Sequence, residues 1–307
     1  MLDQITHLFR LQAIIEEGSL RQAAERLHIT QPALSRSLAQ LESYFGRPLV
    51  ERHARGVRPT LFGLKVRSAS LRLMRQWELT DEELRSEGSG GRIHLRIGAG
   101  PVWRTVILPE LMLEMQRRFP QMVFEIHRAH PTDSYEDLNE GRLDVILSGI
   151  SAENRYPRLV QKKLGVVNNL IVAREGHPVF DRVGPDGRVP SEALLDYPWL
   201  VYTEYQAYRE ITMHAVHERL GRPPEIDLVC DSLNTALASL QRGDYLSLLP
   251  EPITMAAQSP RLLPVPVGLT RREVTIGMII REETSNWEPV QVLGEACGAV
   301  LQELSFS

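Results

Sequence analysis

Cysteine and long apolar runs are scarce in this chain of 307 residues. Its two cysteines, Cys230 and Cys297, stand in unrelated contexts, so we expect two free thiols in a reducing compartment and no disulfide framework. No apolar run approaches the ~18 residues of a membrane span. The first residues show no basic stretch followed by an apolar segment, so we expect no signal peptide. These absences predict a cytoplasmic protein with no membrane partner.

Sequence motifs of several enzyme classes are absent as well. The chain contains no Gly-x-Ser-x-Gly elbow, no phosphate-binding Walker loop and no Cys-x-x-Cys pair. His214 and His217 precede Glu218, but Gly221 occupies the place where a zinc protease has its second histidine. We therefore expect a protein that is not an enzyme, with no catalytic residue, no metal site and no cofactor.

The charge of the chain is divided unevenly. The formal net charge is −4 overall. Residues 1–76 contain 12 Lys and Arg against 6 Asp and Glu, which leaves 23 basic and 33 acidic residues for the remainder. A head of charge +6 joined to a body of charge −10 indicates a polyanion-binding head on a body with another task. The alternative is that the Arg-rich helices are simply solvated.

The first 60 residues predict three short helices followed by a hairpin. Gly18 offers a left-handed stop after the first helix, and Ser19 and Thr30 are candidate caps of the next two. The third helix carries an apolar stripe made of Leu34, Leu38, Leu41 and Phe45. Its outer face is polar and carries Gln31, Ser35, Arg36 and Gln40. This is the pattern of a helix-turn-helix, and residues 48–60 read as a wing.

These residues resemble a known family. Residues 18–36, continued by 41–46 and 49–58, are similar to the winged helix-turn-helix of LysR-type transcriptional regulators. The similarity covers nearly every position over about 45 residues. It departs at Pro59, where an aliphatic residue is usual, and at Leu61 and Phe62, where a polar and a small residue are more common. We expect these departures to leave DNA binding undisturbed.

A long helix is predicted from Thr60 to about Arg85. Its apolar seam is irregular and contains Leu61, Leu64, Leu71, Met74, Trp77 and Leu84. In the resembled family this linker helix dimerises. Residues 87–91 are too rich in glycine to continue a helix and predict a hinge.

Beyond the hinge, strand and helix patterns alternate in a βαβαβ order and then repeat. We predict an α/β multidomain protein with an all-α winged helix-turn-helix head (1–60) and a linker helix (61–87). An effector-binding domain (88–307) follows, a bilobal α/β domain that resembles periplasmic-binding-protein-like folds. Its first lobe is expected at about 88–163 and 268–307, and its second lobe at about 164–267.

Side chains on the outer face of the third helix are the expected base-reading group. Arg36 suits a bidentate contact with guanine, and the helix N-termini and the wing suit phosphates. For any single arginine the alternative is a solvated surface charge. The expected DNA contacts are Ser19, Arg21, Gln22, Thr30, Gln31, Pro32, Ser35, Arg36, Arg52, Arg55 and Arg58.

The carboxyl ends of the α/β strands are the expected effector site. The stretch after the first strand begins like a dinucleotide fingerprint, but Trp103 stands at the third glycine position, which excludes a Rossmann site. In the resembled family this loop supplies hydroxyl and backbone contacts, whereas Gly100 here lacks the usual hydroxyl. We expect Trp103 and Arg104 to compensate by stacking and charge, unless they only pack at the lobe surface. The expected contacts are Gly100, Pro101, Val102, Trp103, Arg104, His130, Thr132, Ser148, Tyr202, Thr203 and Asp231.

Together these features predict a LysR-type regulator that binds double-stranded promoter DNA and responds to a small metabolite bearing a carboxylate or hydroxyls. The resemblance implies a homodimer that pairs into a homotetramer, and contact with RNA polymerase. One alternative is a ligand-independent DNA-binding regulator whose C-terminal domain serves only oligomerisation. Another is a solute-binding or enzyme module with an incidental basic head.

Overall fold

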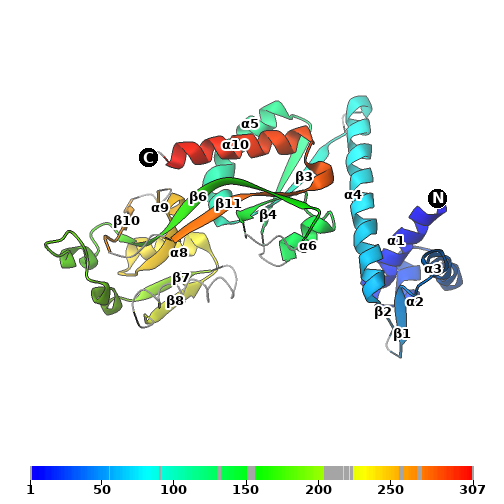
Figure 1. The fold of residues 1–307 in the computed structure, drawn as a ribbon, viewed down its shortest axis with the longest axis horizontal. Helices are drawn as coiled ribbons and strands as arrows, with labels where there is room; N and C mark the ends of the chain where they lie inside the picture. Colours follow the sequence, from blue (N-terminus) through cyan, green and yellow to red (C-terminus); the bar gives the residue numbers. More distant parts are fainter. Residues whose placement is uncertain are drawn as a thin grey trace. The chain divides into compact units, whose positions relative to one another are not determined.

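The computed structural model of this chain describes residues 2–54, 56–89, 91–129, 133–150, 156–203, 217, 221, 224–255, 259–267 and 272–305. They form two compact units, and Figure 1 labels most of their helices and strands. One unit is Met1–His94 with Glu136–Leu143, and the other is Leu95–Tyr135 with Asp144–Ser307. No helix in this part of the chain is long and apolar enough to cross a membrane.

The first unit begins with three helices and a two-stranded hairpin, as predicted. These elements are α1 (Leu2–Glu17), α2 (Leu20–Arg26), α3 (Gln31–Phe45), β1 (Val50–His53) and β2 (Gly56–Pro59). Gly18 adopts a φ of +60° and ends α1. The Ser19 and Thr30 hydroxyls each accept a hydrogen bond from the backbone N–H three residues further on. The predicted helix stop and both caps are confirmed.

The core of this head lies between the three helices and the hairpin. Leu34, Leu38 and Leu41 of α3 are buried in it, which confirms the predicted stripe. The small side chains of α2 allow the helices to approach closely. On α1, in contrast, Ile5 and Phe9 remain exposed, so apolar surface is left outside the core.

The linker helix α4 (Leu61–Ser89) follows the hairpin directly and begins at Thr60, whose hydroxyl accepts a hydrogen bond from the Gly63 N–H (2.8 Å). It continues through Gly88 and ends at Ser89, so the helix extends further into the glycine-rich stretch 87–91 than predicted but ends inside it. A glycine inside a helix costs only about 1 kcal/mol, which other contacts offset. Beyond the helix the chain is held against α4, because Arg75 donates to the His94 carbonyl (2.6 Å) and Glu82 accepts from the His94 N–H (2.9 Å).

A mixed β-sheet forms the centre of the second unit. Its strand order is β10-β6-β11-β5-β3-β4, and β9 pairs with β6. The strands are β3 (Ile93–Ala99), β4 (Met122–Arg128), β5 (Val145–Gly149), β6 (Leu159–Arg174), β9 (Ser247–Pro250), β10 (Leu262–Pro264) and β11 (Arg272–Arg281). Strands β3 and β5 are parallel, as the βαβαβ pattern predicts, whereas β11 is antiparallel to both β5 and β6.

Helices and one smaller strand pair complete this unit. The α-helices are α5 (Leu108–Arg118), α8 (Leu233–Arg242), α9 (Glu251–Met255) and α10 (Glu288–Ser305), while α6 (Asp133–Asn139) crosses into the first unit at Glu136. A π-helical turn, η1 (Trp103–Ile107), precedes α5, and α5 lies beside α10 (Figure 1). Strand β7 (Trp199–Tyr202) pairs in parallel with β8 (Ile226–Cys230). Between β7 and β8, only His217 and Gly221 of residues 204–223 are described.

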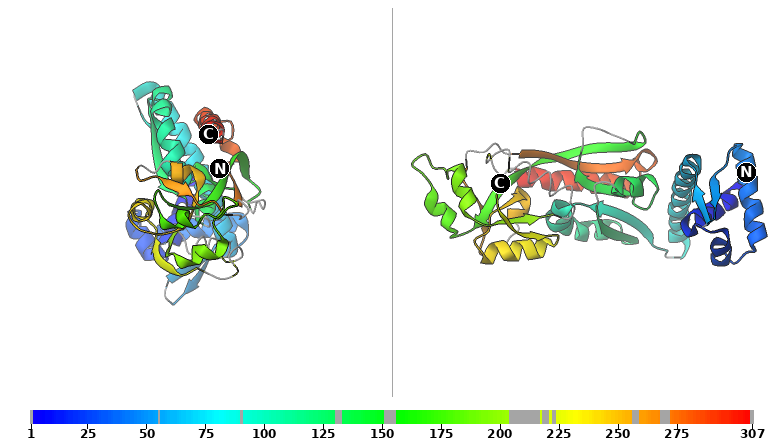
Figure 2. Two further views of the ribbon diagram at one scale, coloured as in Figure 1. Left: turned by 90° about the vertical axis from the view of Figure 1, so that its left-hand side faces the viewer. Right: turned by 90° about the horizontal axis from the view of Figure 1, so that it is seen from below.

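Two long strands, β6 and β11, run side by side through this unit (Figures 1 and 2). Their register shifts between Ile276 and Gly277, which face Gly165 and Lys163 and leave Leu164 as the extra residue of a bulge. A Cβ atom on Gly277 would lie 2.2 Å from the Lys162 carbonyl oxygen, so the close approach of the two backbones requires glycine.

A buried ion pair fixes the start of β5. The Arg281 guanidinium donates to Oδ1 of Asp144 (3.0 Å), and both side chains are almost fully buried. Oδ2 of Asp144 accepts from the Arg96 backbone N–H (3.1 Å). The carboxylate thereby ties β3, β5 and β11 together.

Candidate DNA-binding and effector-binding sites

The outer face of α3 carries the side chains expected to read DNA bases. Gln31, Pro32 and Arg36 are exposed and Ser35 is half-buried, while the leucines on the opposite face are buried in the head. This arrangement presents the beginning of a helix with polar side chains, as a recognition helix does. Near the N-terminus of α2, Arg21 and Gln22 are exposed too.

The hairpin forms the predicted wing. Its two strands pair Glu51 with Arg58 and Arg52 with Val57, and both arginines are exposed. Arg55, also expected to contact DNA, lies outside the described residues. The Val57 N–H donates to the Gly18 carbonyl (2.8 Å), so the wing is attached to the turn between α1 and α2.

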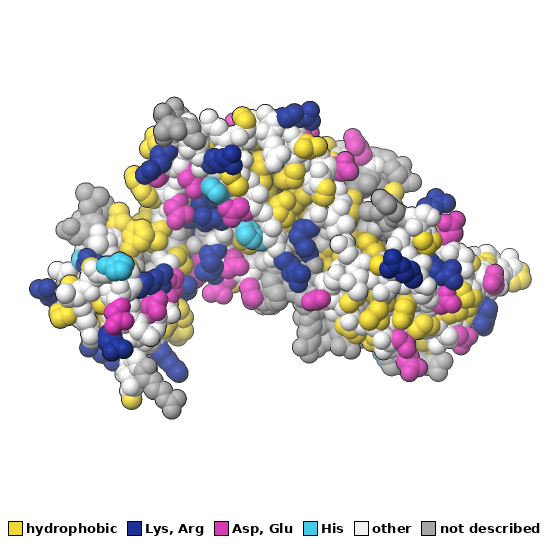
Figure 3. All heavy atoms as spheres, turned by 180° about the vertical axis from the view of Figure 1, so that it is seen from behind, with side chains coloured by type: hydrophobic (Ala, Val, Ile, Leu, Met, Phe, Trp, Pro, Cys, Tyr) yellow, Lys and Arg dark blue, Asp and Glu magenta, His cyan; other side chains and the backbone are white. Residues whose placement is uncertain are grey.

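The arginines of the head differ in their partners. Arg26 donates to Glu16 (2.8 Å) and Glu17 (3.0 Å), and these hydrogen bonds raise the pKa of its guanidinium. Arg36, Arg52 and Arg58 form no ion pair with the described residues and remain available for phosphates or bases. Figure 3 shows Lys and Arg side chains distributed over the visible face of the N-terminal unit.

The loop after β3 holds the first group of expected effector contacts. The Gly100 N–H donates to the Leu147 carbonyl (2.8 Å), and a Cβ atom on Gly100 would lie 3.9 Å from the Cα of Ser148. The ends of the parallel strands β3 and β5 are therefore adjacent, as expected. Arg104 donates from Nε to the Ala99 carbonyl (2.9 Å), so part of its guanidinium serves the loop itself.

The second group lies at the ends of β7 and β8. Tyr202 faces Cys230 in the parallel register, and the Thr203 N–H donates to the Cys230 carbonyl (2.9 Å). Asp231 follows directly and is exposed, whereas Tyr202 and Thr203 are buried. Of the expected contacts, His130 and Thr132 lie outside the described residues.

Two family models cover most of the chain. One, described as the LysR substrate binding domain, matches residues 88–302, and the other, described as bacterial regulatory helix-turn-helix protein, lysR family, matches residues 5–64. The chain belongs to the LysR family of transcriptional regulators. The resemblance seen in the sequence is confirmed, and with it an effector-binding domain behind a DNA-binding head.

Relatives of this LysR-type regulator align along most of their length. The transcriptional regulator TdcA of Escherichia coli K12 is 24% identical over 270 residues, which are 88% of this chain and 84% of TdcA. PcaQ of Agrobacterium fabrum is 25% identical over 318 residues, covering 99% of this chain and 98% of PcaQ. Full-length LysG from Corynebacterium glutamicum, solved with the bound effector Arg, has a TM-score of 0.69 at 17% identity and covers 97% and 98% of the two chains. The likeness to LysG supports the fold.

The position of Trp103 corrects one expectation for this LysR-type regulator. Its side chain is 1% exposed, so neither ring face is free to stack on an effector. The residue is the first of the π-helical turn η1, in which Ile107 is buried as well. Its Nε1–H has no hydrogen-bond acceptor among the described residues, an arrangement that is uncommon for a buried donor. The Cδ1 atom next to that nitrogen lies 3.7 Å from where a Gly100 Cβ would be.

Sequence reasoning assigned no role to several charged residues of α4 and of segment Glu136–Leu143. Arg67, Glu140 and Arg142 form a connected set of ion pairs that includes the buried carboxylate of Glu140. The two partners on α4 and in the segment are 73 residues apart in the sequence, so no local pattern indicates their contact.

Proposed function

We propose that this LysR-type regulator binds double-stranded promoter DNA with α3 in the major groove and the β1–β2 wing on the phosphate backbone. The observation that carries the proposal is the set of exposed arginines without ion-pair partners in the described head, Arg36, Arg52 and Arg58. An arginine on a recognition helix reads guanine, and wing arginines neutralise phosphates. The proposed contacts remain those expected from the sequence.

The exposed apolar side chains of α4 support assembly into a homodimer. Leu73, Trp77 and Leu84 are 50%, 64% and 62% exposed and share one face of the helix, and a contiguous exposed apolar surface marks an association site. Ile5 and Phe9 of α1 add to this apolar surface. We infer that α4 pairs with a second copy, that dimers pair into a homotetramer, and that the assembly contacts RNA polymerase.

The effector proposed for the C-terminal domain is a small metabolite with a carboxylate or several hydroxyls. Its first group of contacts lies at the ends of β3 and β5, where the unsatisfied Trp103 indole N–H and Arg104 supply donors. Its second group lies at the ends of β7 and β8. We place the boundary between the two lobes at the Leu164 bulge, with the lobes as expected from the sequence.

Sequencing of genomic fragments retained by the protein identifies an operator, and fluorescence anisotropy then tests the recognition helix. We expect Arg36→Ala to weaken operator binding by about 1–3 kcal/mol and to relax preference at one base pair per half-site. The control is Arg85→Ala, which removes an exposed arginine of α4 that pairs with Asp81. Undiminished discrimination between operator and scrambled DNA in Arg36→Ala contradicts the proposal.

Titration calorimetry with a metabolite library tests the effector site. Because the Trp103 Nε1–H has no acceptor among the described residues, Trp103→Phe removes a donor while keeping an aromatic ring in the core. We expect about tenfold weaker effector binding, the loss of one hydrogen bond to a charged group. Equal affinity of the two proteins contradicts this placement. Calorimetric silence with intact regulation favours the alternative in which the domain serves only oligomerisation.

A further inference from the structure

The two compact units are joined through three points of the chain. The boundaries fall inside β3 at His94, inside α6 at Glu136, and before β5 at Leu143. Segment Glu136–Leu143 therefore belongs with the head and α4, although it lies between strands β4 and β5 in the sequence. What attaches this segment to α4 determines how α6 and the linker helix influence each other.

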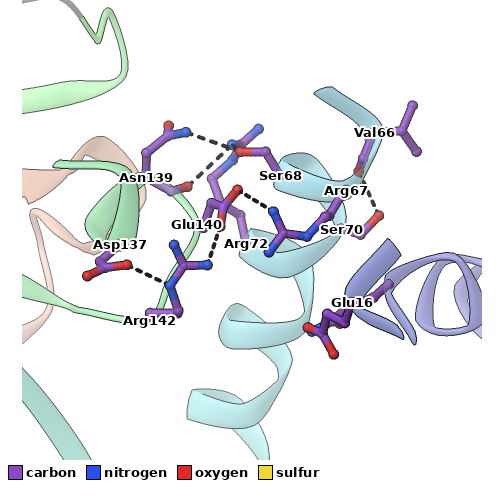
Figure 4. A network of polar contacts seen from close by, with 11 residues as sticks. Glu16, Val66, Arg67, Ser68, Ser70, Arg72, Asp137, Asn139, Glu140 and Arg142 are labelled. Atoms are coloured by element: carbon purple, nitrogen blue, oxygen red, sulfur yellow. Dashed lines mark hydrogen bonds and ion pairs between the residues drawn. The ribbon is translucent and has the colours of Figure 1, made fainter. Parts of the chain in front are cut away.

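A buried carboxylate makes the first attachment (Figure 4). Glu140 is 4% exposed, and its Oε1 accepts from Nη1 of Arg67 on α4 (3.2 Å). Its Oε2 accepts from Arg142 of the same segment, and Nε of Arg142 donates to Asp137 (2.6 Å). Glu140 thus lies between one guanidinium from α4 and one from its own segment.

Hydrogen bonds without a carboxylate make the second attachment. The Asn139 side-chain amide donates to the Ser68 hydroxyl (3.2 Å), and Nη1 of Arg72 donates to the Asn139 carbonyl (3.4 Å). Arg67, Ser68 and Arg72 lie within two turns of α4, so one face of the helix meets the end of α6. We call Arg67, Ser68, Arg72, Asn139 and Glu140 the polar latch.

Close backbone packing continues from the latch. Gly141 has a φ of +80°, and a Cβ atom on it would lie 2.7 Å from the Cβ of Arg75 and 3.5 Å from the Leu71 carbonyl oxygen. Arg75 in turn holds the His94 carbonyl (2.6 Å) at the start of β3. The chain passes between the two units at three points, and α4 contacts it near two of them, at His94 and in segment Glu136–Leu143.

The composition of the latch suits a contact that opens and closes. A buried ion pair adds little net stability compared with an apolar contact, but removing one partner leaves a costly unpaired charge. Arg142 prevents that cost, because it remains bound to Glu140 when Arg67 leaves. The contacts of the latch are also polar, so opening it exposes charged and amide groups that water solvates well.

We propose that the polar latch couples the effector domain to the DNA-binding head, so that DNA binding by the head and the position of α6 change together. The proposal rests on the DNA binding proposed above. Helix α6 begins directly after the expected effector contacts His130 and Thr132 and ends in the latch, while α4 begins directly after the wing. Coupling of this kind is reciprocal, so operator DNA itself is a sufficient probe and no effector is needed.

Hydrogen–deuterium exchange of the full-length protein tests the latch without DNA. We expect Glu140→Gln and Arg67→Met to accelerate exchange of amides 133–143 by about tenfold, the loss of one charged hydrogen bond. The matched control is Arg85→Gln, since Arg85 forms an exposed pair with Asp81 on the same helix (2.8 Å). Unchanged exchange in the latch variants overturns the proposal. Should Glu140→Gln fail to fold, Ser68→Ala, which removes only the hydrogen bond from the Asn139 amide, gives the same readout.

Addition of saturating operator duplex tests the coupling. We expect DNA to change exchange of amides 133–143 severalfold in the wild type and in Arg85→Gln. The change is expected to be lost in Glu140→Gln and in Arg67→Met. No DNA-induced change in the wild type, or the same change in every variant, overturns the latch while leaving the proposed DNA binding intact. A protein that binds no duplex DNA overturns the proposed function and the coupling together.

Discussion

Replacing the two exposed wing arginines with neutral side chains changes how steeply DNA affinity depends on salt. Arg52 and Arg58 lie on paired strands, project from the hairpin and have no ion-pair partner among the described residues. Each phosphate that a cation neutralises releases counterions and contributes about −0.9 to the slope of log affinity against log salt concentration. The double variant R52Q/R58Q therefore removes two contributions from each head.

The magnitude follows from the number of heads on the operator. For a homodimer with both wings on DNA, the slope becomes shallower by about 3.6, and for a single engaged head by about 1.8. If the slope differs by about 3.6, raising the salt concentration from 50 to 200 mM weakens binding of the variant by a factor about 100 times smaller than the factor for the wild type. The same measurement thus reports wing contact and the number of wings engaged.

Fluorescence anisotropy of a labelled operator duplex over this salt range gives the slope. The matched control is R182Q/R261Q, because it changes the net charge equally at two exposed arginines of the other unit. Slopes that agree within about 0.5 between R52Q/R58Q and the wild type refute phosphate contact by the wing. A shallower slope in the control as well assigns the effect to net charge.

Three further predictions concern the second unit. Asp144→Ala leaves Arg281 buried without its carboxylate and is expected to lower the free energy of unfolding by about 3–5 kcal/mol. The double variant Asp144→Leu with Arg281→Met, which removes both charges, is expected to be near neutral. Urea denaturation measures both, and equal losses in the two variants contradict the prediction. Burial raises the pKa of the Cys297 thiol to about 12, so at pH 8 this thiol is protonated and unreactive. We expect Ellman's reagent to label only Cys230 in the native protein, and labelling of both cysteines contradicts the prediction. Burial lowers the pKa of His177, so the unfolded state binds a proton more readily than the folded state and the protein loses stability as the pH falls below about 6.5. We expect this loss to be smaller in His177→Gln. The same dependence of the unfolding free energy on pH in both proteins contradicts the prediction.

Signals that act within a few residues could be predicted from the sequence. Gly18, Ser19 and Thr30 fix the ends of the first helices because each acts on backbone no more than four residues away. The leucine stripe of α3 predicted its buried face for the same reason, since helical periodicity is local. The head, which is built from such signals, was therefore predicted closely.

Features that depend on distant partners were predicted less well. The helix α4 passes through Gly88 while the chain beyond it is held by Arg75 and Glu82, which bond to His94 from 19 and 12 residues away. The burial of Trp103, the first residue of a π-helical turn, likewise has no local sequence signal. The proposed effector contacts depend on distant parts of the chain in the same way, because they come from the ends of four strands that belong to two separate sheets.

The place of β11 in the sheet has a consequence for biosynthesis. This strand is among the last parts of the chain to be made, yet it lies between β5 and β6, pairing with β6 along its whole length and with β5 over Ile276–Ile280. A ribosome-bound chain cannot complete the sheet until residues 272–281 emerge, whereas the head has all its pairing partners by Pro59. Premature termination before residue 272 would therefore leave every element of the head in place and the sheet of the second unit without its central strand β11.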